Sequence, residues 1–220
     1  MASRLWCGVM TYSLNEIGSL FRKAGIGAGL PSGLAEDVSR AGLWLLVRGL
    51  AGDEAVFQGI HSFKPHKSRT RTEGKDIKID PFCSALDGLS VFDLAAASPS
   101  GFRASLRKID TPMLLLGMAG IAAKDYGLQI TIEFSNQSSF SIDANGSIST
   151  DVPVPGQGVD AVLTCGQNGT NQEKPQKLNP TVHVQDRTHK ELLKLAAKTY
   201  VPATAASREK GAGAGLTDND

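Results

Sequence analysis

The chain has 220 residues, a formal net charge of +1 and a hydrophobic content of 41%. A chain of this size and composition can bury a substantial core, and its near-neutral charge gives no general attraction to nucleic acid or to acidic membranes. We therefore expect neither partner. The cysteines, Cys7, Cys83 and Cys165, are far apart and form no Cys-x-x-Cys pair. They indicate neither a zinc site nor a disulfide framework.

The start of the chain lacks the continuous apolar region of a signal peptide. The most apolar run, Pro112 to Ala123, is shorter than the ~18 residues that a membrane-spanning helix requires. These observations predict a soluble protein of the reducing cytoplasm.

The first predicted element is a helix that begins after Ser13. Ser13 stands three residues before Glu16, which is the spacing of a capping box, and apolar residues then recur at helical intervals. Gly25 is expected to end this helix. A second helix is expected to begin at Pro31 and to end near Gly49.

A third, shorter helix is predicted through about Ile60, with Asp53 as its cap. The segment 61–78 that follows is basic, with six lysine or arginine residues against two acids. Phe63 is its one aromatic residue, so the segment offers no stacking platform for bases, and a solvated loop is favoured over a polyanion-binding site. A largely buried helix is predicted over 82–97.

The second half of the chain predicts a sheet over Phe102 to Gln185, with a buried apolar run at 112–123 and an alternating strand at 128–134. A hairpin is predicted around Asn145-Gly146. A two-residue turn would place Ile142 opposite Ser149, whereas a three-residue loop with Gly146 in the left-handed region places it opposite Ile148. The second register is preferred because it pairs two apolar side chains.

A final helix is expected to be capped by Thr188 and to end before Pro202. Helices first, then mainly antiparallel strands, then one helix predict an α+β fold. We expect one domain over 1–220, with a helical part at about 12–97, a sheet and C-terminal helix at about 102–200, and a glycine-rich tail at 201–220.

The tail supplies the candidate ligand site. Its alternate glycines can bring backbone N–H groups close to an anion, and Arg208 can add a bidentate donor to a carboxylate or phosphate. The alternative is a frayed, solvated terminus. The terminal acids could hold a hard cation, but solvated acids are favoured and no metal site is predicted. The candidate residues are Ser207, Arg208, Gly211, Gly213, Gly215, Asp218, Asn219 and Asp220.

Two parts of the chain resemble known families. The run SLNEIGSLFRKAGIGAGLPSGLAEDVSRAGLWLLVRGLAG and the closing TYVPATAASREKGAGAGLTDND resemble an uncharacterised bacterial family. This resemblance implies a bacterial origin and one compact domain, and it carries no activity. Gly29-Leu30-Pro31 and Arg48-Gly49 also resemble the non-Rossmann malate/lactate dehydrogenases, although the His that follows in that family is replaced here by the Leu50–Asp53 segment.

No motif ties this chain to a reaction. A Gly-x-Ser-x-Gly elbow, a Walker loop and a strand-linked Gly-x-Gly-x-x-Gly are all missing from the sequence. The favoured hypothesis is a non-catalytic small-anion-binding or accessory protein whose tail forms the site for a small anion or a partner subunit. The alternative is an enzyme that uses Arg208, Ser207 and the terminal acids. The sequence leaves the cofactor and the oligomeric state open.

Overall fold

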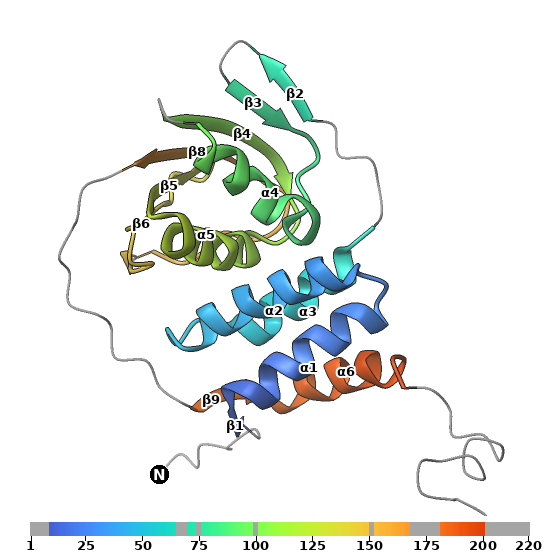
Figure 1. Ribbon diagram of the computed structural model, residues 1–220. Helices are drawn as coiled ribbons and strands as arrows, with labels where there is room; N and C mark the ends of the chain where they lie inside the picture. Colours follow the sequence, from blue (N-terminus) through green and yellow to red (C-terminus); the bar gives the residue numbers. More distant parts are fainter. Residues whose placement is uncertain are drawn as a thin grey trace, which may run out of the picture.

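A seven-stranded sheet forms one side of the molecule, and the helices are stacked in layers against it (Figure 1). The computed structural model describes residues 9–64, 70–73, 76–98, 101–149, 152–167 and 181–200. The strand order across the sheet is β2-β3-β4-β8-β5-β6-β7. The strands are β2 (Thr70–Glu73), β3 (Asp76–Ile79), β4 (Phe102–Ile109), β5 (Leu128–Phe134), β6 (Ser139–Ile142), β7 (Ile148–Ser149) and β8 (Val159–Gln167).

The helices form three successive layers, each in contact with the next (Figure 1). The layer against the sheet holds α4 (Ser84–Ala96) and α5 (Pro112–Tyr126), the middle layer α2 (Ser32–Leu46) and α3 (Gly52–Ser62), and the outer layer α1 (Leu14–Gly27) and α6 (Asp186–Ala197). A two-stranded antiparallel sheet, β1 (Val9–Ser13) with β9 (Thr181–Gln185), lies beside the outer layer.

The predicted α+β class is confirmed, and the large sheet is mainly antiparallel. One pair differs from the expectation, because β3 and β4 are parallel and are joined through α4. Strand β3 of this βαβ unit, together with β2, lies before the region that was expected to hold the whole sheet. Residues 70–73 and 76–78 also fall in the segment expected to be a solvated loop. The pairing of β3 with β4 is a tertiary contact that the local sequence does not reveal.

Helix α5 lies between β4 and β5, inside the region expected to be sheet. Pro112 opens it at a first-turn position, and Gly127 ends it with φ 66°. All of residues 114–123 are buried, so the helix has no polar face and no amphipathic period. This is why the apolar run alone did not distinguish a helix from a strand.

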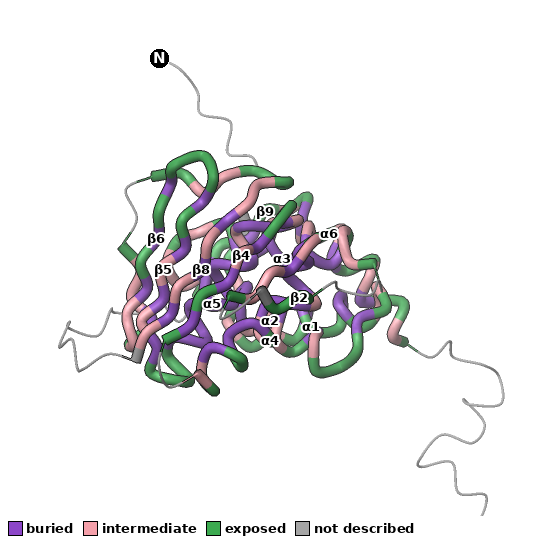
Figure 2. The backbone as a smooth tube through the Cα atoms, turned by 90° about the horizontal axis from the view of Figure 1, so that it is seen from above, coloured by how far each residue is buried: buried purple, intermediate pink, exposed green. Residues whose placement is uncertain are grey.

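The main core lies between the sheet and α5. Alternate residues of β4 and β5 are buried, and those between them are exposed or half-buried, as the changing colours along these strands show (Figure 2). The buried set faces the helices and consists of Phe102, Ala104, Leu106, Leu128, Ile130, Ile132 and Phe134.

The predicted hairpin register is confirmed. Ile142 pairs with Ile148, and Gly146 has φ 75°. The Gly146 carbonyl accepts a 2.8 Å hydrogen bond from Arg48 Nη2, which ties the hairpin tip to the C-terminal end of α2. Arg48 also stacks on the Trp44 ring, with its guanidinium carbon 3.9 Å from the ring centroid. The hairpin is therefore held by both local turn chemistry and a contact from a distant helix.

The observed ends of the helices agree less closely with the predicted ends than the positions of the helices agree with the predicted positions. The Ser13–Glu16 capping box is present as predicted. However, α1 continues through Gly25 to Gly27, because buried Gly25 packs against Ala35 of α2 rather than ending the helix.

Two predicted caps serve other roles in the structure. Asp53 lies inside the first turn of α3, and its carboxylate accepts the Gln185 N–H at 2.9 Å. Thr188 lies inside the first turn of α6, which begins at Asp186, and its hydroxyl donates to Glu54 at 3.1 Å. Both side chains therefore connect α3 to the β9–α6 segment. Helix α4 confirms the helix predicted over 82–97, although Leu94 is 44% exposed.

Candidate functional site

The eight tail residues predicted as a ligand site lie outside the described residues. That site stays a prediction. Within the described residues, a hollow between α1 and α2 brings several charged and polar side chains together. It has a volume of about 310 Å³ and is lined by Leu14, Asn15, Gly18, Ser19, Arg22, Lys23, Glu36, Ser39, Arg40 and Leu43. We call it the α1–α2 groove.

The groove follows from the spacing of residues on two neighbouring helices. α1 and α2 are joined by a short turn and run side by side in opposite directions (Figure 1). On α2 the lining residues recur at intervals of three and four, which places them along one face of the helix. The lining residues of α1 follow the same spacing, so each helix presents one face, mostly polar, to the hollow.

Small residues form the floor of the groove. Ser39 Oγ donates a 2.9 Å hydrogen bond to the Gly18 carbonyl, so the two helix backbones approach closely at this point. A Cβ added to Gly18 would lie 3.0 Å from Leu43 Cδ1. The floor is therefore formed by Gly18 and Ser39, with the Leu43 methyl group above Gly18.

Three cations and one acid line the groove. Arg22 Nε lies 3.0 Å from Glu36 Oε2, and both side chains are about half exposed. Lys23 has no carboxylate partner in the described part of the chain, and its Nζ lies 5.3 Å from the centroid of the Tyr200 ring. Arg22 is paired with Glu36 and Arg40 with Asp125, so within the described residues the rim carries a surplus of one positive charge, that of Lys23.

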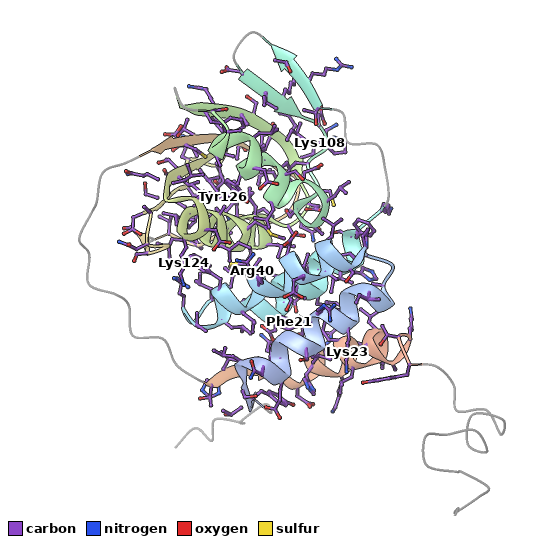
Figure 3. The ribbon with its side chains drawn as sticks, viewed as in Figure 1. Phe21, Lys23, Arg40, Lys108, Lys124 and Tyr126 are labelled. Atoms are coloured by element: carbon purple, nitrogen blue, oxygen red, sulfur yellow. The ribbon has the colours of Figure 1, made fainter. Side chains whose placement is uncertain are left out.

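Arg40 connects the groove to the next helical layer. It donates to Asp125 of α5, and Figure 3 shows its label between α2 and α5. This hydrogen bond is the main cause of a raised Arg40 pKa. Burial raises the pKa of neighbouring Asp37, an effect that Arg40 opposes and Asp93 and Glu36 reinforce.

Tyr126 belongs to the same network. Its hydroxyl donates a 2.6 Å hydrogen bond to Asp93 of α4. That bond is the largest cause of a Tyr126 pKa of about 12. The network keeps Arg40 charged and oriented at the edge of the groove.

The other reactive side chains are occupied in the fold. Burial raises the pKa of Cys83 to about 12, with a contribution from Asp110, and burial alone raises the pKa of Cys165 to about 12. Both thiols are therefore neutral at physiological pH and are poor nucleophiles. Tyr12 stacks on His189, and His183 contacts Thr11, so both histidines support the β1–β9 and α6 region.

No metal site was found either. The described residues contain no group of three or more His, Cys, Asp or Glu that could hold a metal ion. None of the helices in those residues combines the length and apolar character needed to cross a bilayer.

Sequence reasoning missed the groove. The available signal was a polar residue at successive turns of two helices that are otherwise apolar on their inner faces. Reading this signal as a site also requires knowing that Gly18 faces Ser39, which only the tertiary structure supplies.

Residues 12–98 match the model of a protein family of unknown function, DUF3726. This confirms the predicted resemblance of the N-terminal run to an uncharacterised family, and the tail lies outside the matched residues. Every residue that lines the groove falls within the match. A search of curated proteins found no match.

Two solved structures show a distant likeness, as the N-terminal resemblance to malate/lactate dehydrogenases led us to expect. Malate dehydrogenase from Entamoeba histolytica is 11% identical, with a TM-score of 0.45 over 58% of this chain and 39% of that one. Sulfolactate dehydrogenase from Methanocaldococcus jannaschii is 10% identical, with a TM-score of 0.48 over 90% of this chain and 94% of that one. The chain thus spans about two fifths of the first dehydrogenase. At these scores the likeness carries no argument about activity.

Proposed function

We propose that this protein binds a small organic anion in the α1–α2 groove and does not convert it chemically. The observation that supports this most directly is the surplus of positive charge around a hollow with a small-residue floor. Guanidinium and ammonium groups bind carboxylates and phosphates through charge-assisted hydrogen bonds. A concave site that gathers such donors is the usual form of a small-molecule site.

The existing contacts leave donors available to a ligand. Arg22 uses Nε for Glu36 and Nη2 for Ser32, at 3.4 Å, and a guanidinium has five N–H donors. Lys23 contributes an ammonium group without a described carboxylate partner. An anion can therefore be accommodated beside the Arg22–Glu36 pair without displacing it.

The size of the groove limits the ligand. A volume of about 310 Å³ corresponds to about ten water molecules, at roughly 30 Å³ each. This lies at the lower end of the range for ligand pockets. The part of a ligand held inside the groove therefore has about ten non-hydrogen atoms.

The groove lacks a free carboxylate, a histidine and a cysteine, which favours binding over catalysis. Among the groove residues, Glu36 is the one carboxylate, and it is held by Arg22. Neither histidine nor cysteine lines the groove. General acid–base catalysis requires a group that is free to exchange protons and is within hydrogen-bond reach of the ligand.

The test is a calorimetric titration with acetate, succinate, phosphate and sulfate, on the wild type and on the double variant Arg22→Gln/Lys23→Gln. We expect the double variant to bind at least tenfold more weakly, because it loses two charge-assisted donors. The matched control is Arg103→Gln, since Arg103 is an exposed arginine of β4 that is paired with Asp76 away from the groove. An equal loss in the control, or no binding to the wild type, would contradict the proposal.

The enzyme alternative and the tail site are separated by two further measurements. Nuclear magnetic resonance of the bound anion should show it unchanged after prolonged incubation, and turnover would favour the enzyme. A protein shortened after Lys210 should retain binding if the groove is the site. Loss of binding on shortening, with no effect of Arg22→Gln/Lys23→Gln, would favour the predicted tail residues instead.

A further inference from the structure

The two ends of the α1–α2 groove differ in chemistry. Because the helices run in opposite directions, the start of α1 lies beside the end of α2, and the reverse holds at the other end. Leu14 and Leu43 therefore share one end of the groove. Arg22, Lys23 and Glu36 line the other end.

The leucine end presents apolar surface to the hollow. Leu14 and Leu43 are half-buried, and each packs against the core with part of its side chain. The rest of each side chain lines the groove. The Leu43 methyl group also lies above Gly18, so the apolar surface extends onto the floor.

The distance between the two ends suits a short chain. Leu14 and Arg22 are eight residues apart on α1, which corresponds to about 12 Å along the helix axis. Between them lie Gly18 and the Ser39 side chain, with the Leu43 methyl group above Gly18.

We infer that the ligand is an amphipathic monocarboxylate, with its carboxylate at the Arg22–Lys23 end and a short aliphatic chain on Leu14 and Leu43. This inference rests on the proposed function and adds the class of ligand. A purely hydrophilic dianion would leave the leucine end wet and unused. An aliphatic chain removes that surface from water, which is favourable in proportion to the area buried.

The test is a titration series with acetate, butanoate and hexanoate, which share one carboxylate and differ in chain length. Each methylene that reaches the leucine end should raise the affinity up to about fourfold. Hexanoate should therefore bind at least tenfold more tightly than acetate. Affinities within twofold across the series would overturn the inference and leave the proposed anion site intact, whereas no binding by any of the three, or by sulfate, would overturn both.

A pair of variants tests whether the dependence of affinity on chain length arises at the leucine end. Leu43→Asn should remove the chain-length dependence, and Leu43→Met should keep it because it preserves the apolar surface. Leu14→Asn provides an independent variant at the same end should Leu43→Asn fail to fold. Hexanoate that keeps its advantage over acetate in every folded asparagine variant would place the chain elsewhere and overturn the inference.

Discussion

Helix α2 packs against α5 on one side and against α1 on the other, and glycine residues lie at both contacts with opposite results. Toward α5, the Trp44 ring lies on Gly120, where an added Cβ would be 2.0 Å from Trp44 Cε2. Toward α1, Gly18 faces Ser39 and Leu43. The first contact is filled and buried, and the second leaves the groove open.

The difference shows that glycine alone does not decide between a core and a site. A glycine permits close approach of two helices, and the residue opposite decides whether the space is filled. A large aromatic side chain fills it, whereas serine bonds to the backbone and leaves a hollow. The exposed position of α1 in the outer layer then allows charged residues to line that hollow.

The largest change in stability should come from a substitution at the filled contact between α2 and α5. Gly120→Ala should destabilise the protein by about 3 kcal/mol, because its Cβ overlaps the Trp44 ring and neither helix can move without disturbing the core. Urea unfolding measures the change. The control is Gly33→Ala, where an added Cβ meets nothing within 4 Å and stability should stay within about 0.5 kcal/mol of the wild type. Equal losses of stability from Gly120→Ala and Gly33→Ala would contradict the claim that the contact at Gly120 is filled by Trp44.

The second effect concerns the hairpin that covers the Trp44–Gly120 contact. Gly146→Ala should cost about 2 kcal/mol, because φ is 75° and the new Cβ would lie 3.0 Å from the Gly120 carbonyl oxygen. Gly49 has nearly the same φ, 74°, with open space around it. Gly49→Ala should therefore cost only about 1 kcal/mol. If Gly146→Ala leaves thermal and urea stability unchanged, the left-handed assignment is wrong.

Substitutions on the side of α2 that faces α1 should change the stability less. Ser39→Ala removes the hydrogen bond to the Gly18 carbonyl and should cost about 1 kcal/mol. Ser19→Ala is the matched control, since Ser19 also lines the groove but is exposed on its rim. Its effect on urea unfolding should be within about 0.5 kcal/mol. A larger loss from Ser19→Ala than from Ser39→Ala would contradict the proposed floor.

The smallest effect is a pH dependence on the side of α2 that faces α4. Burial raises the pKa of Asp37, so the native state binds its proton more tightly than the unfolded state. The free energy of unfolding should therefore fall as pH rises from the ordinary aspartate pKa of 3.8 through the raised native value. Asp37→Asn should flatten this decline and raise stability at pH 7 by a few tenths of a kcal/mol, since solvent screens a partly exposed group. A pH series of urea unfolding curves that stays parallel in the two proteins would exclude this role.

Local rules predicted the features that depend on neighbouring residues. The Ser13–Glu16 capping box and the left-handed Gly146 follow from turn and cap chemistry within a few residues, and both are present. The Ile142–Ile148 pairing follows from matching two apolar side chains across that turn.

Features that depend on distant partners could not be predicted in the same way. Residues 114–123 of helix α5 are all buried, so this stretch has no period that separates helix from strand. The parallel β3–β4 pair and the role of Asp53 at the Gln185 N–H depend on contacts across the fold. The groove depends on Gly18 facing Ser39, and the two lie on different helices.

The most direct test of the central claim is to locate the bound anion on α2. Titrations of isotope-labelled protein with acetate and with hexanoate can be followed by amide and indole nuclear magnetic resonance. We predict saturable shifts at the amides of Gly18, Ser19 and Ser39, with the Trp44 indole N–H on the opposite side of α2 unchanged. Saturable shifts centred on Trp44 or on another surface, or no saturable shifts with either anion, would contradict the assignment of the α1–α2 groove as an anion-binding site.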